Sequence, residues 1–456
     1  MSAHVKDMTH GSPAKLILTF ALPLMLGNVF QQLYTTVDTA IVGQFAGVEA
    51  LAALGAADWL NWMTLGIVTG FTGGFSIPIA QRFGAGDLQG LRKAVGMSAL
   101  LGAVIAVVLT LVSECIARPV LLLLNTPANV LDLALTYLRV MFAGLCVVMF
   151  YNILASLLRA LGDSRTPLIA MLIASVINIA LDLLFVVIFH WGVAGAAAAT
   201  VIAQIFSALF CLRAVFNLPM LRLTRKDFVP DPVCIRTLVR LGTPMALQNA
   251  IIAVGGMGVQ YVVNGFGFLF VAGFTATNKL YGLLEIAATS FGFSMATFTG
   301  QNLGAQQLAR IQKGLRAAAL MGVATALCIS AAMFAWGRSI LSLFVSESSG
   351  SAAEVLDIAY RYLCVMSSIL FILYLLHVYR SALQGMGDTV IPMISGFVEL
   401  VMRVGVAWLL PRFIGQEGIY YAEIAAWTGA AALLIAAYYV RIHGFKRALA
   451  EGRPMV

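Results

Sequence analysis

The residues most clearly suited to chemistry are two acids inside apolar segments, Asp38 and Asp182. A charged side chain near the centre of a bilayer costs at least about 2.5 to 3.5 kcal/mol on insertion scales, so an acid in such a place is generally functional. Burial and mutual repulsion favour a protonated carboxyl group, while oxygen ligands equally suit a hard cation such as sodium. We interpret the pair as a proton or sodium site. The alternative is that each acid only hydrogen-bonds a neighbouring helix.

Polar residues accompany both acids at helical spacing. Residues three or four positions apart share one face of a helix, so Asn178 and Asp182 point the same way. A similar polar stripe leads to Asp38 along the first apolar segment, and it should face a water-accessible interior. This stripe consists of Asn28, Gln31, Thr35 and Asp38, with Tyr34 beside them.

Other side chains are candidates for the same interior. Neighbouring apolar segments contribute three polar groups, Tyr137, Asn152 and Thr200. Methionine and aromatic side chains can line an adaptable cavity for cationic aromatic ligands, although each one taken singly is more typical of packing. The predicted lining of a substrate cavity consists of Gln31, Tyr34, Met63, Tyr261 and Tyr281.

The second half of the chain carries a different set of ionisable residues. Glu285 lies in the middle of an apolar segment with only Lys279 near it in sequence, so it is a candidate for cation or substrate binding, together with Gln260. Glu399 and Arg403 are four residues apart and are expected to form a structural ion pair. The carboxylate pair of the first half is therefore not repeated.

The composition identifies the medium that surrounds these residues. Of the 456 residues, 61% are hydrophobic and 11% are charged, whereas a soluble domain has about 25% charged residues. Such a chain belongs in a bilayer, where only helices and closed barrels satisfy the backbone. The apolar segments are about 20 residues or longer and do not alternate every second residue, so we predict an all-α membrane protein.

Twelve membrane spans are predicted, and the charges of the loops orient them. The spans are 15–42, 51–81, 93–115, 130–158, 166–190, 194–217, 237–263, 270–300, 312–336, 355–380, 390–411 and 419–441. Lysine and arginine gather in the loops on the side of the N-terminus, which places both termini in the cytoplasm. The net charge of +8 reflects these loops and not a nucleic-acid site. The six cysteines lack the spacing of a metal or redox motif.

The chain contains an internal duplication. Residues 81–85 (QRFGA) correspond to residues 301–305 (QNLGA), and Gly162, Asp163 and Pro167 correspond to Gly387, Asp388 and Pro392. The polar stretch 218–236 divides the chain into two six-helix lobes, 1–217 and 237–456. Each repeat crosses the membrane an even number of times, and transporters with this symmetry bind their substrate between the repeats.

These motifs resemble the multidrug and toxic compound extrusion (MATE) transporters over essentially the whole chain. The resemblance rests on Pro23 followed by Val37-Asp38-Thr39, on residues 81–86, on RALGDSRTP at 159–167, on Asn178-x-x-x-Asp182 and on residues 195–200. The acids of the first half are similar to those of the DinF-like branch. The resemblance implies a V-shaped pair of six-helix bundles and a cation site in the N-terminal lobe. The residues that match this site are Asp38, Asn178, Asp182 and Thr200, and more loosely Tyr137 and Asn152.

The resemblance also implies a function. We expect export of amphipathic, often cationic organic compounds in exchange for protons or sodium, across the bacterial inner membrane, by a monomer that contacts membrane lipids and needs no cofactor. A kink at Pro23 would link ion binding to the first helix. The alternative is a flippase for lipid-linked or polysaccharide precursors, and an enzyme is not expected. In relatives with an acidic site in the second lobe, helices 7, 8 and 10 provide carboxylates, whereas Gln260 and His377 occupy two of these helices here and leave Glu285 alone.

Overall fold

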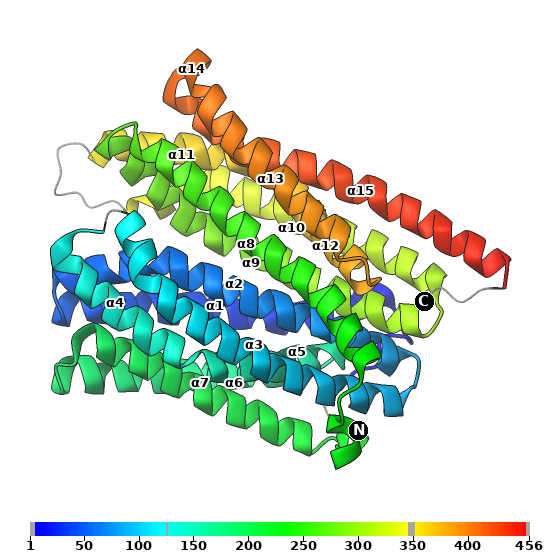
Figure 1. Ribbon diagram of the computed structural model, residues 1–456. Coiled ribbons are helices and arrows are strands. Elements are labelled where there is room, and N and C mark those ends of the chain that lie inside the picture. Colours follow the sequence, from blue (N-terminus) through cyan, green and yellow to red (C-terminus); the bar gives the residue numbers. More distant parts are fainter. Residues whose placement is uncertain (1–4, 125, 345–351, 453–456) are drawn as a thin grey trace. The chain divides into compact units, whose positions relative to one another are not determined.

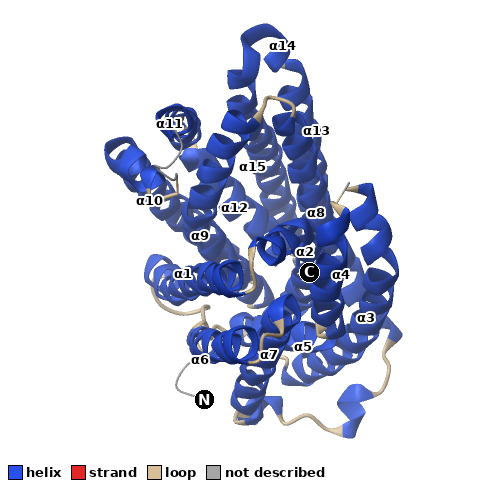
Figure 2. Ribbon diagram, turned by 90° about the vertical axis from the view of Figure 1, so that its left-hand side faces the viewer, coloured by secondary structure: helices blue, strands red, loops and turns tan. Residues whose placement is uncertain are grey.

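The computed structural model describes residues 5–124, 126–344 and 352–452, and over these residues the chain is helical and contains no strand (Figures 1 and 2). The long helices of the first half are α1 (Pro13–Phe45), α2 (Val48–Gly84), α3 (Leu88–Leu123), α4 (Ala128–Ala143), α5 (Leu145–Ala160), α6 (Arg165–Asp182) and α7 (Gly192–Phe216). Those of the second half are α8 (Pro232–Asn264), α9 (Phe268–Gly304), α10 (Leu308–Ser342), α11 (Ala352–Ser368), α12 (Leu370–Gly385), α13 (Val390–Leu409) and α15 (Tyr420–Ala450). The short helices are η1 (Leu183–Ile188), η2 (Pro219–Leu221), η3 (Arg225–Phe228), α14 (Pro411–Ile414) and η4 (Gly415–Ile419).

The helices account for twelve crossings of a membrane. Within the described ranges, eight helical stretches are long and apolar enough to span, or ten when each of two bent pairs counts as one span. One of the eight joins α13 to α15 and contains two crossings, and the less apolar α9 adds another. The protein is therefore a multi-pass membrane protein with twelve membrane helices in two six-helix bundles, as predicted.

Two predicted spans are broken, and the sequence did not reveal this. The span expected at 130–158 consists of α4 and α5, which meet at a bend of 49°, and the span expected at 355–380 consists of α11 and α12, with a bend of 51°. Gly144 separates the first pair, and a Cβ atom at this position would lie 2.5 Å from Val201. The chain bends where a residue of α7 occupies the space of a side chain, and hydropathy carries no sign of such a contact.

The described residues divide into two compact units. Unit 1 contains residues 5–10 and 22–250, and unit 2 contains residues 11–21 and 251–452. The polar stretch after α7 packs on unit 1, because Arg92 donates to the carbonyl of Met220 at 2.8 Å and Lys93 donates to that of Val229 at 2.6 Å. The division into lobes at 218–236 stays a prediction.

Helix α2 forms the centre of unit 1 and packs against α3, α4 and α5. Its glycines allow an even closer approach to α8. A Cβ atom at Gly70 would lie 2.5 Å from the Cα atom of Ala246, so only glycine fits there. Small residues at such crossings are typical of membrane helices, which associate through close packing.

A turn before α6 sets the position of that helix and of the residues on it. Gly162 has φ +81°, a conformation that glycine adopts without strain. The carboxylate of Asp163 then accepts hydrogen bonds from the backbone N–H groups of Arg165 and Thr166, at 3.0 and 2.9 Å. It therefore caps the first turn of the helix that carries Asn178 and Asp182.

Candidate functional site

Asp38 and Asp182 lie together in the interior of unit 1. Asp38 is on α1 and is 7% exposed, whereas Asp182 ends α6 and is fully buried. Their carboxyl groups are within interaction distance of each other. Among the described residues, neither oxygen of Asp182 has a hydrogen-bond donor, and the same is true of Oδ1 of Asp38. Two ionised carboxyl groups buried this close would lose hydration and repel each other, so the arrangement is suited to a shared proton or a bound cation.

The helix that carries Asp182 changes its winding at this residue. The α-helical part ends there, and residues Leu183–Ile188 continue as a π-helix. π-Helical turns inside α-helices are rare and are frequently found at functional sites. This change of winding was not predicted from the sequence.

Asn178 and Thr200 complete the oxygen-rich surroundings. The amide of Asn178 donates to the hydroxyl of Thr200 at 3.3 Å, and the amide oxygen is buried without a donor among the described residues. Tyr137 of α4 is also buried and lies within electrostatic range of Asp38 and Asp182. The structure therefore brings together five of the six residues predicted for the cation site.

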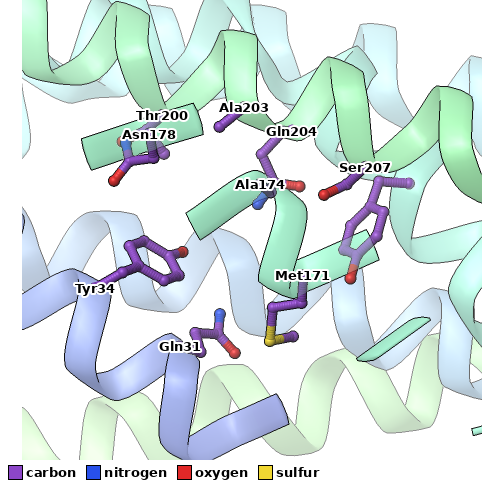
Figure 3. A pocket seen from close by; sticks show the side chains of 10 residues that line it. Gln31, Tyr34, Met171, Ala174, Asn178, Thr200, Ala203, Gln204 and Ser207 are labelled. Atoms are coloured by element: carbon purple, nitrogen blue, oxygen red, sulfur yellow. The ribbon is translucent and has the colours of Figure 1, made fainter. Parts of the chain in front are cut away.

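A small pocket opens beside this group (Figure 3). Its volume is about 30 Å³, which is room for one or two water molecules. Figure 3 shows the side chains of Gln31 and Tyr34 on α1 directed toward residues of α6 and α7. The sequence analysis identified none of the remaining lining residues, which are Tyr151, Met171, Ala174, Ala203, Gln204 and Ser207.

The other predicted residues of unit 1 do not line this pocket. The amide of Asn152 donates to the carbonyl of Val148 at 2.8 Å, within its own helix. Met63 is partly buried and packs against the hydrophobic core. Pro23 lies inside α1, which is helical from Pro13 to Phe45, and a kink there stays a prediction.

Asp58 of α2 is a further acid near the site that the sequence did not single out. Its charge acts on both Asp38 and Tyr137. It lies in an apolar segment between Ala57 and Trp59, and this is the same signal that identified the other two acids. A search for every acid in an apolar segment would have found it.

In unit 2, Glu285 has a partner from a distant part of the chain. Its Oε1 atom lies 3.5 Å from Nε2 of His377 on α12. The two residues are far apart in sequence, so only the packing of α9 against α12 reveals the pair. Gln260 does not take part in this contact and donates to Asn264 at 2.8 Å.

The two tyrosines predicted for a substrate cavity occupy different surroundings. Tyr261 of α8 is 83% exposed, whereas Tyr281 of α9 stacks on Trp427 with ring centres 5.8 Å apart. Neither tyrosine lines the pocket of unit 1. Their role in substrate binding stays a prediction.

The predicted ion pair of Glu399 and Arg403 is confirmed and belongs to a larger cluster. The two side chains are 3.6 Å apart, and Arg403 also contacts Glu423 of α15 at 2.9 Å. Arg380 of α12 pairs with the other oxygen of Glu399. This alternation of charges, buried among α12, α13 and α15, is the arrangement that buried ionic groups require.

Comparison with known proteins identifies the family. The family model MatE matches residues 23–184 and 244–409. The chain belongs to the MatE family. The model matches once in each half, which agrees with the duplication seen in the sequence. Two relatives from Bacillus subtilis are named "Probable multidrug resistance protein YpnP", 28% identical over 76% of this chain and 78% of the relative, and "Probable multidrug resistance protein YoeA", 27% identical over 92% of each. Both relatives are thus named as multidrug resistance proteins.

Solved structures share the fold. One, described as the outward-facing conformation of a multidrug resistance MATE family transporter, has a TM-score of 0.91 and 24% identity, and the match covers 98% of this chain and 99% of the other. Another, of a MATE in complex with a ligand called MaL6, has a TM-score of 0.90. At this level of identity, the likeness establishes the twelve-helix fold.

Proposed function

We propose that the chain is a secondary active antiporter that exports amphipathic, often cationic organic compounds in exchange for protons, with sodium as the alternative coupling ion. One observation supports this proposal: Asp38 and Asp182 are buried together, and both oxygens of Asp182 and Oδ1 of Asp38 have no hydrogen-bond donor among the described residues. A bound proton or cation would relieve both the lost hydration and the repulsion of the two acids. The pair is therefore suited to take up an ion and to release it.

Ion binding must favour one conformation for this exchange to do work. Asp38 is on α1 and Asp182 is on α6, so an ion between them would draw these helices together. At Gly27, α1 approaches α6 so closely that a Cβ atom would lie 3.3 Å from Leu168. The two helices are thus in close contact at this point.

The size of the pocket explains why transport needs movement. Pockets for organic compounds are about 300 to 1,000 Å³, far larger than the 30 Å³ present here. Because Gln31 and Tyr34 line the pocket from α1, a shift of this helix away from α6 and α7 would enlarge it. A substrate would then occupy the space beside the two acids, and their charge would favour an organic cation.

Lysine and arginine gather in the loops on the side of the N-terminus. This bias supports a location in the bacterial inner membrane with both termini in the cytoplasm. Uptake of an ion from outside would then drive a compound outward. We infer a monomer as the working unit, since each chain contains both repeats.

Transport by the purified protein in liposomes tests this function. A proton gradient and a sodium gradient are imposed separately, and export of a fluorescent organic cation such as ethidium is followed. We expect the proton gradient to drive export and Asp38→Asn to reduce it to the level of liposomes without protein. Export that is unchanged in this variant, or that ignores both gradients, would contradict the proposal.

A further inference from the structure

The linker between α7 and α8, residues 217–231, is held against the membrane helices of unit 1. Lys93 of α3 donates to the carbonyl oxygens of Lys226 and Val229, at 3.2 and 2.6 Å. Both α7 and α8 are long and apolar enough to span a membrane, so the linker leaves the bilayer where α7 ends and returns to it where α8 begins. It therefore lies beside the first turns of α3, at the surface of the bilayer.

The backbone of the linker is fixed at η3. A Cβ atom at Gly96 of α3 would clash with the carbonyl oxygen of Asp227, so only glycine allows this close approach. The carboxylate of Asp227 accepts hydrogen bonds from the backbone N–H and the hydroxyl of Thr224, at 2.7 and 2.9 Å. These contacts hold the backbone against α3, so the exposed side chains of the linker have a defined place on the surface.

Basic side chains are concentrated on the linker and on the turns of α7 and α8 that adjoin it. The exposed ones are Arg213, Arg222, Arg225, Lys226, Arg236 and Arg240. The acids of this stretch, Asp227 and Asp231, accept hydrogen bonds from the backbone N–H groups of Thr224 and Val233. Residues 213–240 have a net charge of +4. A basic cluster of this size directly beside a membrane helix attracts anionic lipid headgroups.

Large apolar side chains are exposed among these basic residues. Phe216 at the end of α7 is 72% exposed and Val233 at the start of α8 is 76% exposed, and Phe228 and Val229 of the linker are exposed as well. In a segment that lies on a membrane, such side chains enter the boundary between headgroups and acyl chains, while lysine and arginine contact the phosphates. A purely electrostatic partner such as a nucleic acid would leave these apolar side chains in water.

We propose that the linker and the adjoining turns of α7 and α8 form a binding surface for anionic phospholipids of the leaflet that they face. Arg222, Arg225 and Lys226 contact the phosphate groups, and the planar N–H donors of the two arginines suit phosphate oxygens. Phe216 and Phe228 enter the boundary with the acyl chains. The surface is separate from the proposed ion site and does not depend on transport.

Native mass spectrometry of the full-length protein, titrated with lipid in detergent, tests this surface. The two probes are phosphatidylglycerol, which is anionic, and phosphatidylcholine with the same acyl chains, which is zwitterionic. We expect the wild type to bind phosphatidylglycerol more tightly. A basic residue near a membrane surface contributes about fivefold in affinity for anionic lipid, so the triple variant Arg222→Gln, Arg225→Gln, Lys226→Gln should weaken phosphatidylglycerol binding by on the order of 10- to 100-fold. Its binding of phosphatidylcholine should not change.

A second triple variant is the matched control. Arg441→Gln, Lys446→Gln, Arg447→Gln removes the same charge from exposed positions of α15, and we expect it to bind phosphatidylglycerol nearly as the wild type does. Equal losses in the two triple variants would overturn the proposal, because net charge and not the linker would then decide lipid binding. Equal affinities of the wild type for the two lipids would also overturn it, as would binding of a short single-stranded DNA through the linker without a preference for phosphatidylglycerol. The comparison of the two lipids needs only the wild type, so it decides even if a variant does not fold.

Discussion

The amide of Asn178 on α6 donates a hydrogen bond of 3.3 Å to the hydroxyl of Thr200 on α7. This bond crosses between two helices next to the buried acids and fixes which way the amide oxygen points. The oxygen that it leaves free is buried and faces no donor among the described residues. The pair thus sets the orientation of one oxygen in the predicted ion site.

Thr200→Val should therefore disturb the site without changing the shape of the side chain. Valine has the size of threonine but leaves the buried amide of Asn178 without its acceptor, which costs about 1 to 3 kcal/mol. We expect lower thermal stability in detergent and slower ion-driven export. Thr136→Val on α4 is the control, because its exposed hydroxyl only donates to the carbonyl of Asp132 in the same helix. Equal stabilities of the two variants would contradict this role of Thr200.

Gly70→Ala should destabilise unit 1. The added Cβ atom would lie 2.5 Å from the Cα atom of Ala246, and the two backbones would have to separate. Overpacking of this kind costs about 1 to 3 kcal/mol. Thermal unfolding monitored by tryptophan fluorescence measures the change.

Gly55→Ala in the same helix is the matched control. No atom lies within 4 Å of a Cβ atom at Gly55, and alanine is a better helix former than glycine by about 1 kcal/mol. We expect this variant to be at least as stable as the wild type. If both substitutions destabilise the protein alike, the close approach at Gly70 is not the cause.

The sequence could predict the parts of the site that depend on one helix. Asn178 and Asp182 are four residues apart, so their shared face follows from helical geometry alone. The spans also followed from hydropathy, because the bilayer demands about 20 apolar residues for each crossing. Both features are local, and they were found.

The parts that depend on how helices pack against each other were missed. Tyr151 and Gln204 line the pocket because α5 and α7 present these positions to one another, and no spacing along the chain shows this. His377 and Glu285 meet for the same reason. The close contact between Gly144 and Val201 also joins two different helices. Contacts of this kind are properties of the tertiary structure.

The cluster in unit 2 should depend strongly on Arg403. Arg403→Met leaves Glu399 and Glu423 buried without this partner, and breaking a buried ion pair from one side costs about 3 to 5 kcal/mol. We expect a large loss of thermal stability. The control is Arg338→Met, because Arg338 and Asp357 are 2.7 Å apart but each is 53% exposed, and such pairs contribute about 0 to 1 kcal/mol. Similar losses of thermal stability in both variants would show that the buried cluster contributes no more to stability than the exposed pair.

The polar stretch after α7 should loosen in acid. A hydrogen bond from the backbone N–H of Thr224, at 2.7 Å, lowers the pKa of Asp227. Because the folded pKa is below the unfolded value, this contribution is fully present above the unfolded pKa and is lost as the pH falls through the folded pKa. Acid-stable proteases such as pepsin should therefore cleave near η3 faster below about pH 4. Asp227→Asn should abolish this dependence, and a variant that keeps it would point to another group.

Asp182→Asn should raise stability and abolish coupling at once. The fully buried carboxyl group lies beside that of Asp38 and has no donor among the described residues, so a neutral amide of the same shape removes the repulsion. We expect a higher midpoint of thermal unfolding at pH 8, where an ionised pair would be least favourable. Ion-driven export in liposomes should fall to background, because the pair no longer takes up a proton or sodium.

A gain in stability together with a loss of export distinguishes a coupling site from a structural one. If Asp182 only held neighbouring helices together, its replacement would lower stability and export in parallel. Asp132→Asn on α4 is the matched control, since this acid is exposed and should change neither quantity. Stability that falls in Asp182→Asn would therefore count against the pair as an ion site, because the buried charge would then be supported by contacts and not by an exchangeable ion.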